Sequence, residues 1–182
     1  MNTALIVIDV QQSFEHRPYW RTDGVGPFLA RIQDLIDRAR ERGVPVLQVF
    51  HEEQTGVFSR ASGYVKTLAS LRIEPTEVFY KNVHSALFGR TSDGKSLETW
   101  LRENRIEHVI VTGIRTEQCC ETTARHASDL GFRVTYALDA TLTFPMVAKS
   151  GRTYSAEDIM ERTALVLDDR FASVVSTGAV AI

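Results

Sequence analysis

Cys119 is the residue whose type and position point most directly to chemistry. It follows an expected strand at 108–113 by a short loop and lies in the first turn of an expected helix at 117–130. A helix N-terminus carries partial positive charge and unpaired N–H groups, which lower the pKa of a thiol, favour the nucleophilic thiolate and can hold an oxyanion. The alternative is a small core residue, the commoner fate of cysteine and the one we expect for Cys120.

Asp9 and Lys81 also stand directly after expected strands. Asp9 ends the apolar stretch 4–8, where a buried carboxylate needs a partner and could act as a general base. The alternative for Asp9 is a cap or a hydrogen bond within a loop. Lys81 follows 78–80 in a chain with four lysines against seventeen arginines. On its own Lys81 would be assigned to the surface, but its place after a strand makes it a candidate partner.

The elements that position these residues alternate between strands and helices. Expected strands cover 4–8, 44–50, 78–80, 108–113, 132–138 and 171–176, and expected helices cover 27–43, 95–104, 117–130 and 155–167, with a short helix near 65–71. This alternation is typical of a parallel sheet with helices on both faces. Ligands of such sheets bind outside the carboxyl ends of the strands. We therefore expect Asp9, Lys81 and Cys119 to meet at one edge, with His51 and Asp139 following two other strands.

Composition excludes several classes of protein. The 182 residues suit one domain, 1–182, and the net charge of −2 from 21 basic and 23 acidic residues gives no footprint for nucleic acid or a membrane. Adjacent cysteines do not form a disulfide framework. No apolar run approaches the roughly 18 residues that span a bilayer. We expect a soluble, cytoplasmic protein that binds a small-molecule substrate.

The sequence contains no pattern typical of a cofactor or metal site. Gly24-Val-Gly26 lacks a preceding strand and a third glycine, and there is no Walker loop. His51, Glu52 and Glu53 do not have the tight spacing that zinc or iron sites favour. We therefore expect neither a cofactor nor a metal.

The segment beside Asp9 is rich in residues that recognise small molecules. Aromatic side chains enclose a ligand, and Arg17 or Arg21 could bind a carboxylate, although such residues are also enriched at subunit interfaces. The candidate substrate-binding residues are Phe14, His16, Tyr19, Trp20, His51, His84, Phe88 and Phe144.

Four blocks of the sequence resemble one known family. They are Ala-Leu-Ile-Val-Ile-Asp-Val-Gln-Gln-Ser-Phe at 4–14, Lys-Asn-Val-His-Ser-Ala-Leu-Phe at 81–88, Val-Ile-Val-Thr-Gly-Ile-Arg-Thr-Glu-Gln-Cys at 109–119 and Ala-Leu-Asp-Ala at 137–140. In this order they resemble the isochorismatase-like cysteine hydrolase superfamily, which includes nicotinamidases, N-carbamoylsarcosine amidase and isochorismatases. The second block departs from the family pattern, because Leu87 replaces the usual Phe.

The resemblance implies a fold and a site. The fold is a Rossmann-like three-layer α/β/α arrangement around a mostly parallel six-stranded sheet. Asp9, Lys81 and Cys119 would form the catalytic triad. A cis peptide bond between Ile114 and Arg115 would aim the Arg115 N–H, together with that of Cys119, at an oxyanion. Relatives are commonly dimers or larger, so the resemblance also implies a homo-oligomer.

The resemblance further implies hydrolysis of a small amide, carbamoyl or ureide C–N bond through a thioester on Cys119. Members that cleave the vinyl ether of isochorismate lack the cysteine, so Cys119 favours acyl chemistry. Nicotinamidases carry an Asp-x-His metal element after the second strand, where this chain has His51-Glu-Glu53, which disfavours nicotinamide. Two alternatives stay open: a vinyl-ether hydrolase like isochorismatase, and a non-catalytic binding or redox-sensing protein that uses Cys119 and Cys120.

Overall fold

The computed structural model describes residues 2–182 and contains a six-stranded parallel sheet. Its strands are β1 (Thr3–Ile8), β2 (Val46–His51), β3 (Glu77–Lys81), β4 (His108–Ile114), β5 (Arg133–Leu142) and β8 (Ser173–Val175), in the spatial order β3-β2-β1-β4-β5-β8. A separate antiparallel hairpin joins β6 (Met146–Val147) to β7 (Thr153–Tyr154). The parallel sheet is the one predicted from the alternation of elements, so the predicted fold class is confirmed.

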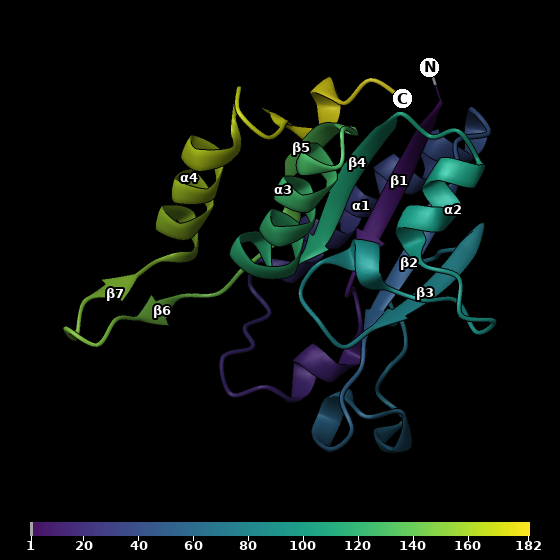
Figure 1. The fold of residues 1–182 in the computed structure, drawn as a ribbon. Coiled ribbons are helices and arrows are strands. Elements are labelled where there is room, and N and C mark those ends of the chain that lie inside the picture. Colours follow the sequence, from purple (N-terminus) through teal and green to yellow (C-terminus); the bar gives the residue numbers. More distant parts are fainter. Residues whose placement is uncertain (1) are drawn as a thin grey trace.

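The helices are α1 (Val25–Glu41), α2 (Leu97–Glu103), α3 (Glu121–Asp129) and α4 (Ala156–Leu167). In Figure 1, α2 and α3 cover the near face of the sheet and α1 covers the far face. The central strand β1 is apolar and buried from Ala4 to Ile8, because both of its faces are covered. Ala4, Ile6 and Ile8 pack into the core on the α2–α3 side, and Leu5 and Val7 pack into the core on the α1 side.

Three local expectations differ from the structure. The short helix expected near 65–71 is wrong, and the nearby helical turns are instead the 3-10 turns Gly56–Phe58 and Arg60–Ser62. β5 continues to Leu142, so Asp139 lies within the strand rather than after it, and its carboxylate binds Thr177, just after β8, and Arg31 on α1. The helix expected from 117 begins with a π-helical turn, Thr116–Cys120, before α3.

Gly113 fixes the close approach of β4 to the end of β1. It pairs with Ile8 and has a φ of 130°, and a Cβ at this position would lie 2.0 Å from the Ile8 carbonyl oxygen. Only glycine fits such a conformation and such a contact. The residue after Ile8 is Asp9, and the loop after Gly113 carries Cys119, so this approach brings the two candidate residues to the same place.

None of the helices among residues 2–182 is long and apolar enough to cross a membrane.

Candidate active site

The structure brings Asp9, Lys81 and Cys119 together at the carboxyl edge of the sheet. Lys81 ends β3, and its Nζ donates to Asp9 Oδ2 at 2.7 Å and to Cys119 Sγ at 3.4 Å. The side chains of Asp9 and Lys81 are fully buried, at 0% exposure each. A buried ion pair is costly to desolvate unless its geometry is good and its remaining hydrogen bonds are made. The predicted convergence of these three residues is therefore present, with an ammonium group between the carboxylate and the thiol.

Asp9 adopts an unusual backbone conformation at this edge. Its φ is 54°, in the left-handed region that few non-glycine residues enter, although Asp and Asn do so more readily than others. Its N–H donates to the Val49 carbonyl at 2.8 Å. The conformation ends β1 and turns the carboxylate toward Lys81. Strain of this kind is concentrated at functional sites, which agrees with the position of Asp9.

His51, at the end of β2, is the third partner of the Lys81 ammonium group. Its Nδ1 lies 3.3 Å from Lys81 Nζ. A lysine ammonium has three N–H donors and no acceptor, so the ring nitrogen that faces it must be unprotonated. Asp9, Cys119 and His51 then provide one acceptor for each N–H of Lys81. The proton of neutral His51 is on Nε2, which lies 3.6 Å from Glu53 Oε1.

Gln11 fixes the backbone of His51, a role that sequence reasoning missed. The Gln11 side chain donates to the His51 carbonyl at 3.0 Å and accepts from its N–H at 2.8 Å. Gln11 is fully buried, two residues after Asp9. The available signal was an amide side chain directly after a buried strand, where an unpaired polar group would be costly. The contact itself joins positions 40 residues apart and is not visible in the sequence.

The electrostatics of Cys119 contradict one expectation from the sequence. Burial and the charge of Asp9 raise the pKa of the Cys119 thiol to about 12, although Lys81 acts in the opposite direction. The predicted lowering of this pKa by a helix N-terminus is wrong, because Cys119 is only 7% exposed and desolvation disfavours the thiolate. Cys119 is therefore a thiol at neutral pH and needs a base to become a nucleophile.

The ammonium state of Lys81 and the neutral state of His51 follow from the same surroundings. Burial on its own would lower the pKa of Lys81, but the charge of Asp9, with the hydrogen bonds of Lys81 to Asp9 and to the Cys119 sulfur, outweighs it and raises that pKa above its ordinary value. Burial, followed by the charge of Lys81, lowers the pKa of His51. At neutral pH the site thus contains a cationic lysine and a neutral histidine.

The peptide bond between Ile114 and Arg115 is cis, as the family resemblance implied. The Arg115 carbonyl accepts hydrogen bonds from the N–H groups of Gln118 and Cys120, at 3.1 and 3.3 Å, so the chain from Arg115 to Cys120 forms a tight turn. The Arg115 side chain is buried, with its guanidinium 4.9 Å from the ring centre of Tyr19 and 3.0 Å from Glu117 Oε1.

Among the candidate substrate-binding residues, His51 and His84 contact the three central residues. His84 is exposed, and its Nδ1 lies 4.0 Å from Cys119 Sγ, so it stands where a ligand would approach the thiol. His51 contacts Lys81 as described. A role of either residue in binding substrate remains a prediction.

The other candidates lie in aromatic pairs around the site. Phe14 packs edge-on against Phe58, which also contacts His51, and His16 stacks on Tyr64. Tyr19 and Trp20 both pack on Phe144, which is only 2% exposed. Phe88 is 60% exposed and packs on His126. Phe14 and Phe144 are thus chiefly core residues, and each of the others remains a predicted substrate contact.

No group of three or more His, Cys, Asp or Glu side chains in residues 2–182 lies close enough to hold a metal ion. The histidine at the end of β2 presents its unprotonated nitrogen to Lys81.

Comparison with known proteins identifies relatives over nearly the whole chain. A model of the isochorismatase domain matches residues 3–175. The uncharacterized isochorismatase family protein YrdC from Bacillus subtilis is 28% identical over 96% of this chain and 91% of its own. Nicotinamidase 3 from Arabidopsis thaliana is 32% identical over 78% of this chain and 73% of its own. The solved structure of an isochorismatase from Pseudomonas putida superposes with a TM-score of 0.84 at 28% identity, covering 99% of this chain and 90% of that one.

Proposed function

This chain belongs to the isochorismatase family, and from that premise we propose that it is a cysteine hydrolase that cleaves the C–N bond of a small amide, carbamoyl compound or ureide. The observation that carries the proposal is the contact of one buried ammonium group, Lys81 Nζ, with both Asp9 and Cys119. A carboxylate base, a thiol nucleophile and a cation between them are the components of nucleophilic catalysis on a carbonyl. Similarity to two nicotinamidases supports an amide as the substrate class.

The first step is attack by Cys119 on the substrate carbonyl. The thiol is protonated at neutral pH, because burial raises its pKa to about 12, so its proton must leave as the S–C bond forms. Asp9 takes that proton. Asp9 Oδ2 accepts from Lys81, and Oδ1 is buried with no hydrogen-bond partner among residues 2–182, so Oδ1 is the oxygen that accepts it. The carbonyl oxygen gains the electron pair, and the N–H groups of Arg115 and Cys119 stabilise it.

The second and third steps return the enzyme to its starting state. As the carbonyl re-forms, the C–N bond breaks and the proton on Asp9 moves to the departing nitrogen, which leaves ammonia or an amine and a thioester on Cys119. A water molecule then gives a proton to Asp9 and attacks the thioester. The S–C bond breaks, the acid is released, and the proton returns to Cys119. Lys81 remains an ammonium group throughout and holds Asp9 and the sulfur in position.

The test is intact-protein mass spectrometry during incubation with a panel of amides, carbamoyl compounds and ureides. We expect a transient mass increase confined to Cys119, equal to the acyl group of the substrate, and release of ammonia or amine. Cys119→Ala is the control and should show neither. Incubation with isochorismate tests vinyl-ether cleavage: turnover that survives Cys119→Ser would contradict the thioester route.

The same samples distinguish the proposed hydrolase from a redox-sensing protein. A protein that acts through its two thiols would show reversible oxidation of Cys119 and Cys120 and no turnover of any compound. Release of ammonia by the wild type, lost in Cys119→Ala and kept in Cys120→Ala, would exclude that alternative.

A further inference from the structure

A hairpin far from the candidate active site in the sequence exposes apolar side chains. Residues 145–155, here named the arm, contain the β6–β7 hairpin, in which Met146 pairs with Tyr154 and Val147 with Thr153. The arm extends away from the body of the protein at the lower left of Figure 1. Val147 is 70% exposed and Tyr154 is 37% exposed. An isolated two-stranded hairpin is at best marginally stable in water, so these exposed apolar side chains indicate a surface that another element covers.

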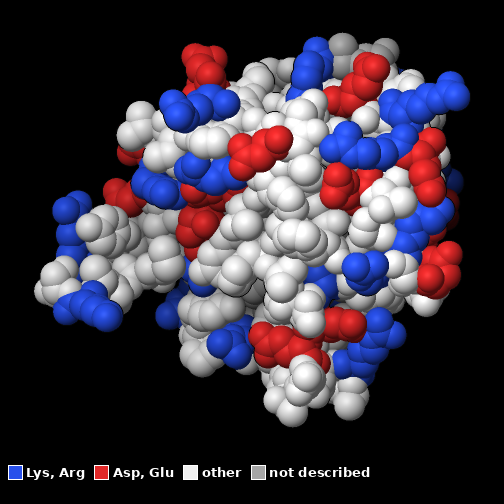
Figure 2. Space-filling model, in the orientation of Figure 1, with Lys and Arg blue, Asp and Glu red and all other residues white. Residues whose placement is uncertain are grey.

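The arm is also positively charged. It contains Lys149 and Arg152 and no acidic residue. In Figure 2 its outer end shows blue and white atoms only, whereas the rest of this face mixes both signs of charge. The arm is thus an apolar hairpin with a basic tip.

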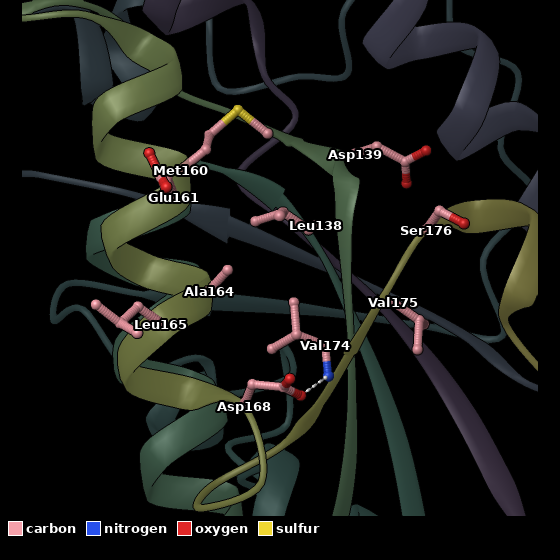
Figure 3. Close-up of a pocket in the computed structure, with 10 residues that line it drawn as sticks. All are labelled: Leu138, Asp139, Met160, Glu161, Ala164, Leu165, Asp168, Val174, Val175 and Ser176. Carbon is pink, nitrogen blue, oxygen red and sulfur yellow. Dashed lines mark hydrogen bonds between the residues drawn. The ribbon is translucent and has the colours of Figure 1, made fainter.

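A cleft of about 700 Å³ lies between α4 and the strands β5 and β8. Its apolar lining comprises Leu138, Met160, Ala164, Leu165, Val174 and Val175. Figure 3 shows Leu138 and Val174 on the strands facing Ala164 on the helix across this space. The cleft is open because β8 is the last strand of the sheet and is only three residues long. Leu165 at its margin is 79% exposed, more than any other large apolar side chain in residues 2–182.

The rim of the cleft is acidic. Asp139, Glu161 and Asp168 line it, and no lysine or arginine does. Asp139 is paired with Arg31 and Asp168 accepts from the Val174 N–H, whereas Glu161 is exposed on the surface of α4. The cleft is therefore apolar inside and negative at its edge, which complements the arm in both respects.

We propose that the arm of one copy of this chain docks in the α4–β5–β8 cleft of a second copy. Val147, the more exposed of the two apolar side chains, buries its surface against Leu138, Val174 and Leu165, and the basic tip meets the acidic rim. Each copy carries both the arm and the cleft, so a two-fold axis makes the contact twice in a closed dimer. Complementary charges select this partner and this orientation.

The experiment is a charge exchange between arm and cleft, followed by sedimentation velocity. The arm variant is Lys149→Glu/Arg152→Glu, and the cleft variant is Glu161→Lys. The wild type should be dimeric, and each variant alone should dissociate with a Kd raised by about tenfold or more, because like charges then face each other. Mixed in equal amounts, the two variants should form a heterodimer, since the acidic arm now fits the basic cleft and the unchanged arm and cleft fit each other.

The matched control is Arg40→Glu, which reverses an exposed charge on α1 and should leave the Kd unchanged. Circular dichroism verifies that each variant is folded, and Arg152→Gln and Val147→Ser provide milder changes at the same surface. A monomeric wild type at 100 µM (an arbitrary upper concentration of about 2 mg/ml), variants as dimeric as the wild type, or a mixture that fails to associate would each overturn the proposal. The readout is mass alone, so the result is independent of the proposed enzymatic activity.

Discussion

Two regions of the molecule differ in which side chains they bury and which they expose to water: the carboxyl edge of the sheet, and the α4 side with the arm. At the carboxyl edge, the charged pair Asp9 and Lys81 is fully buried. At the α4 edge, Leu165 and Val147 are largely exposed. Burial of charge and exposure of apolar surface are both unfavourable for an isolated monomer. We attribute the first to the proposed chemistry, which needs a desolvated ion pair, and the second to the proposed contact with a second copy of the chain. The following predictions test that contrast.

The largest effect should come from Cys119→Ser. A serine hydroxyl cannot form the thioester and is a far weaker acid than a thiol, so we expect kcat/KM on a responsive amide to fall on the order of 10⁴-fold or more. The fold should persist, because the change is nearly isosteric. Cys120→Ala is the matched control and should keep its activity, since Cys120 is fully buried in the core. A small loss in Cys119→Ser would remove Cys119 from the mechanism.

Breaking the buried pair should lower stability strongly. Asp9→Asn or Lys81→Met leaves one buried charge without its partner, and we expect each to reduce the free energy of unfolding by about 3–5 kcal/mol in urea denaturation. The double variant should lose less than the sum of the two. Arg40→Ala breaks a pair with Glu74 whose side chains are 69% and 78% exposed, and should cost less than about 0.5 kcal/mol. An equal loss of unfolding free energy on breaking the buried and the exposed pair would contradict the idea that burial makes the Asp9–Lys81 pair special.

Gly113→Ala tests the approach of β4 to β1 that supports the site. A Cβ there would lie 2.0 Å from the Ile8 carbonyl, on a backbone with φ of 130°. We expect a loss of about 3 kcal/mol or more in the free energy of unfolding, with reduced activity in the folded fraction. Gly178→Ala, which meets no atom within 4 Å, is the control and should be nearly neutral. Normal stability in Gly113→Ala would show that the strands can separate.

The pH dependence of kcat/KM should depend on His51. Its pKa is lowered by burial and by Lys81, and among its other neighbours His84 acts in the same direction while Asp9 and Glu53 oppose it. His51 is therefore neutral above its ordinary pKa and gains a proton only as the pH falls below it. The protonated ring cannot accept from Lys81 and repels it, so activity should fall on the acid side.

His51→Gln and His51→Ala separate this effect from simple loss of packing. Glutamine retains an acceptor that does not titrate, so its acid limb should shift to lower pH while activity at pH 7 is largely kept. Alanine should lower kcat by about tenfold at pH 7, the equivalent of roughly 1.4 kcal/mol in activation free energy. An unchanged acid limb in His51→Gln would exclude His51 as the titrating group.

The smallest effect should be that of Leu165→Gln on the monomer. Leu165 is 79% exposed, so in the background of the arm variant we expect a change below about 0.5 kcal/mol in the free energy of unfolding. In the wild-type background the same change should weaken association. A large loss of monomer stability would mean that Leu165 is part of the core instead.

The sequence predicted the fold class and the meeting of Asp9, Lys81 and Cys119, because apolar runs define buried strands and parallel strands end at one edge. It did not predict His51 as the third partner of Lys81, since that contact depends on how far neighbouring strands extend. Nor did it predict the raised pKa of Cys119. A helix N-terminus is visible in a sequence, whereas the desolvation that outweighs it here depends on how the surrounding chains pack.

Local sequence propensity also gave wrong secondary structure in two segments. The segment 65–71 was expected to be helical, but it lies against the residues that follow β1: Thr67 bridges to Gln11, and the Leu68 N–H donates to the Val10 carbonyl. β5 was expected to end before Asp139, but it continues to Leu142 and pairs with Gly113 and Ile114 beyond a register shift. In both places the backbone pairs with a segment distant in the sequence, and single-sequence patterns do not show such pairing.

The raised pKa of Cys119 also bears on how durable the protein is. Peroxides and alkylating agents react with thiolates far faster than with thiols. In the proposed mechanism the sulfur gives its proton to Asp9 only as it attacks a bound substrate, so in the resting state such reagents meet a thiol and not a thiolate. In the free protein, Cys119 should therefore be alkylated by iodoacetamide more slowly than an ordinary exposed cysteine. The high pKa that makes Cys119 depend on a base also protects it from chemical damage.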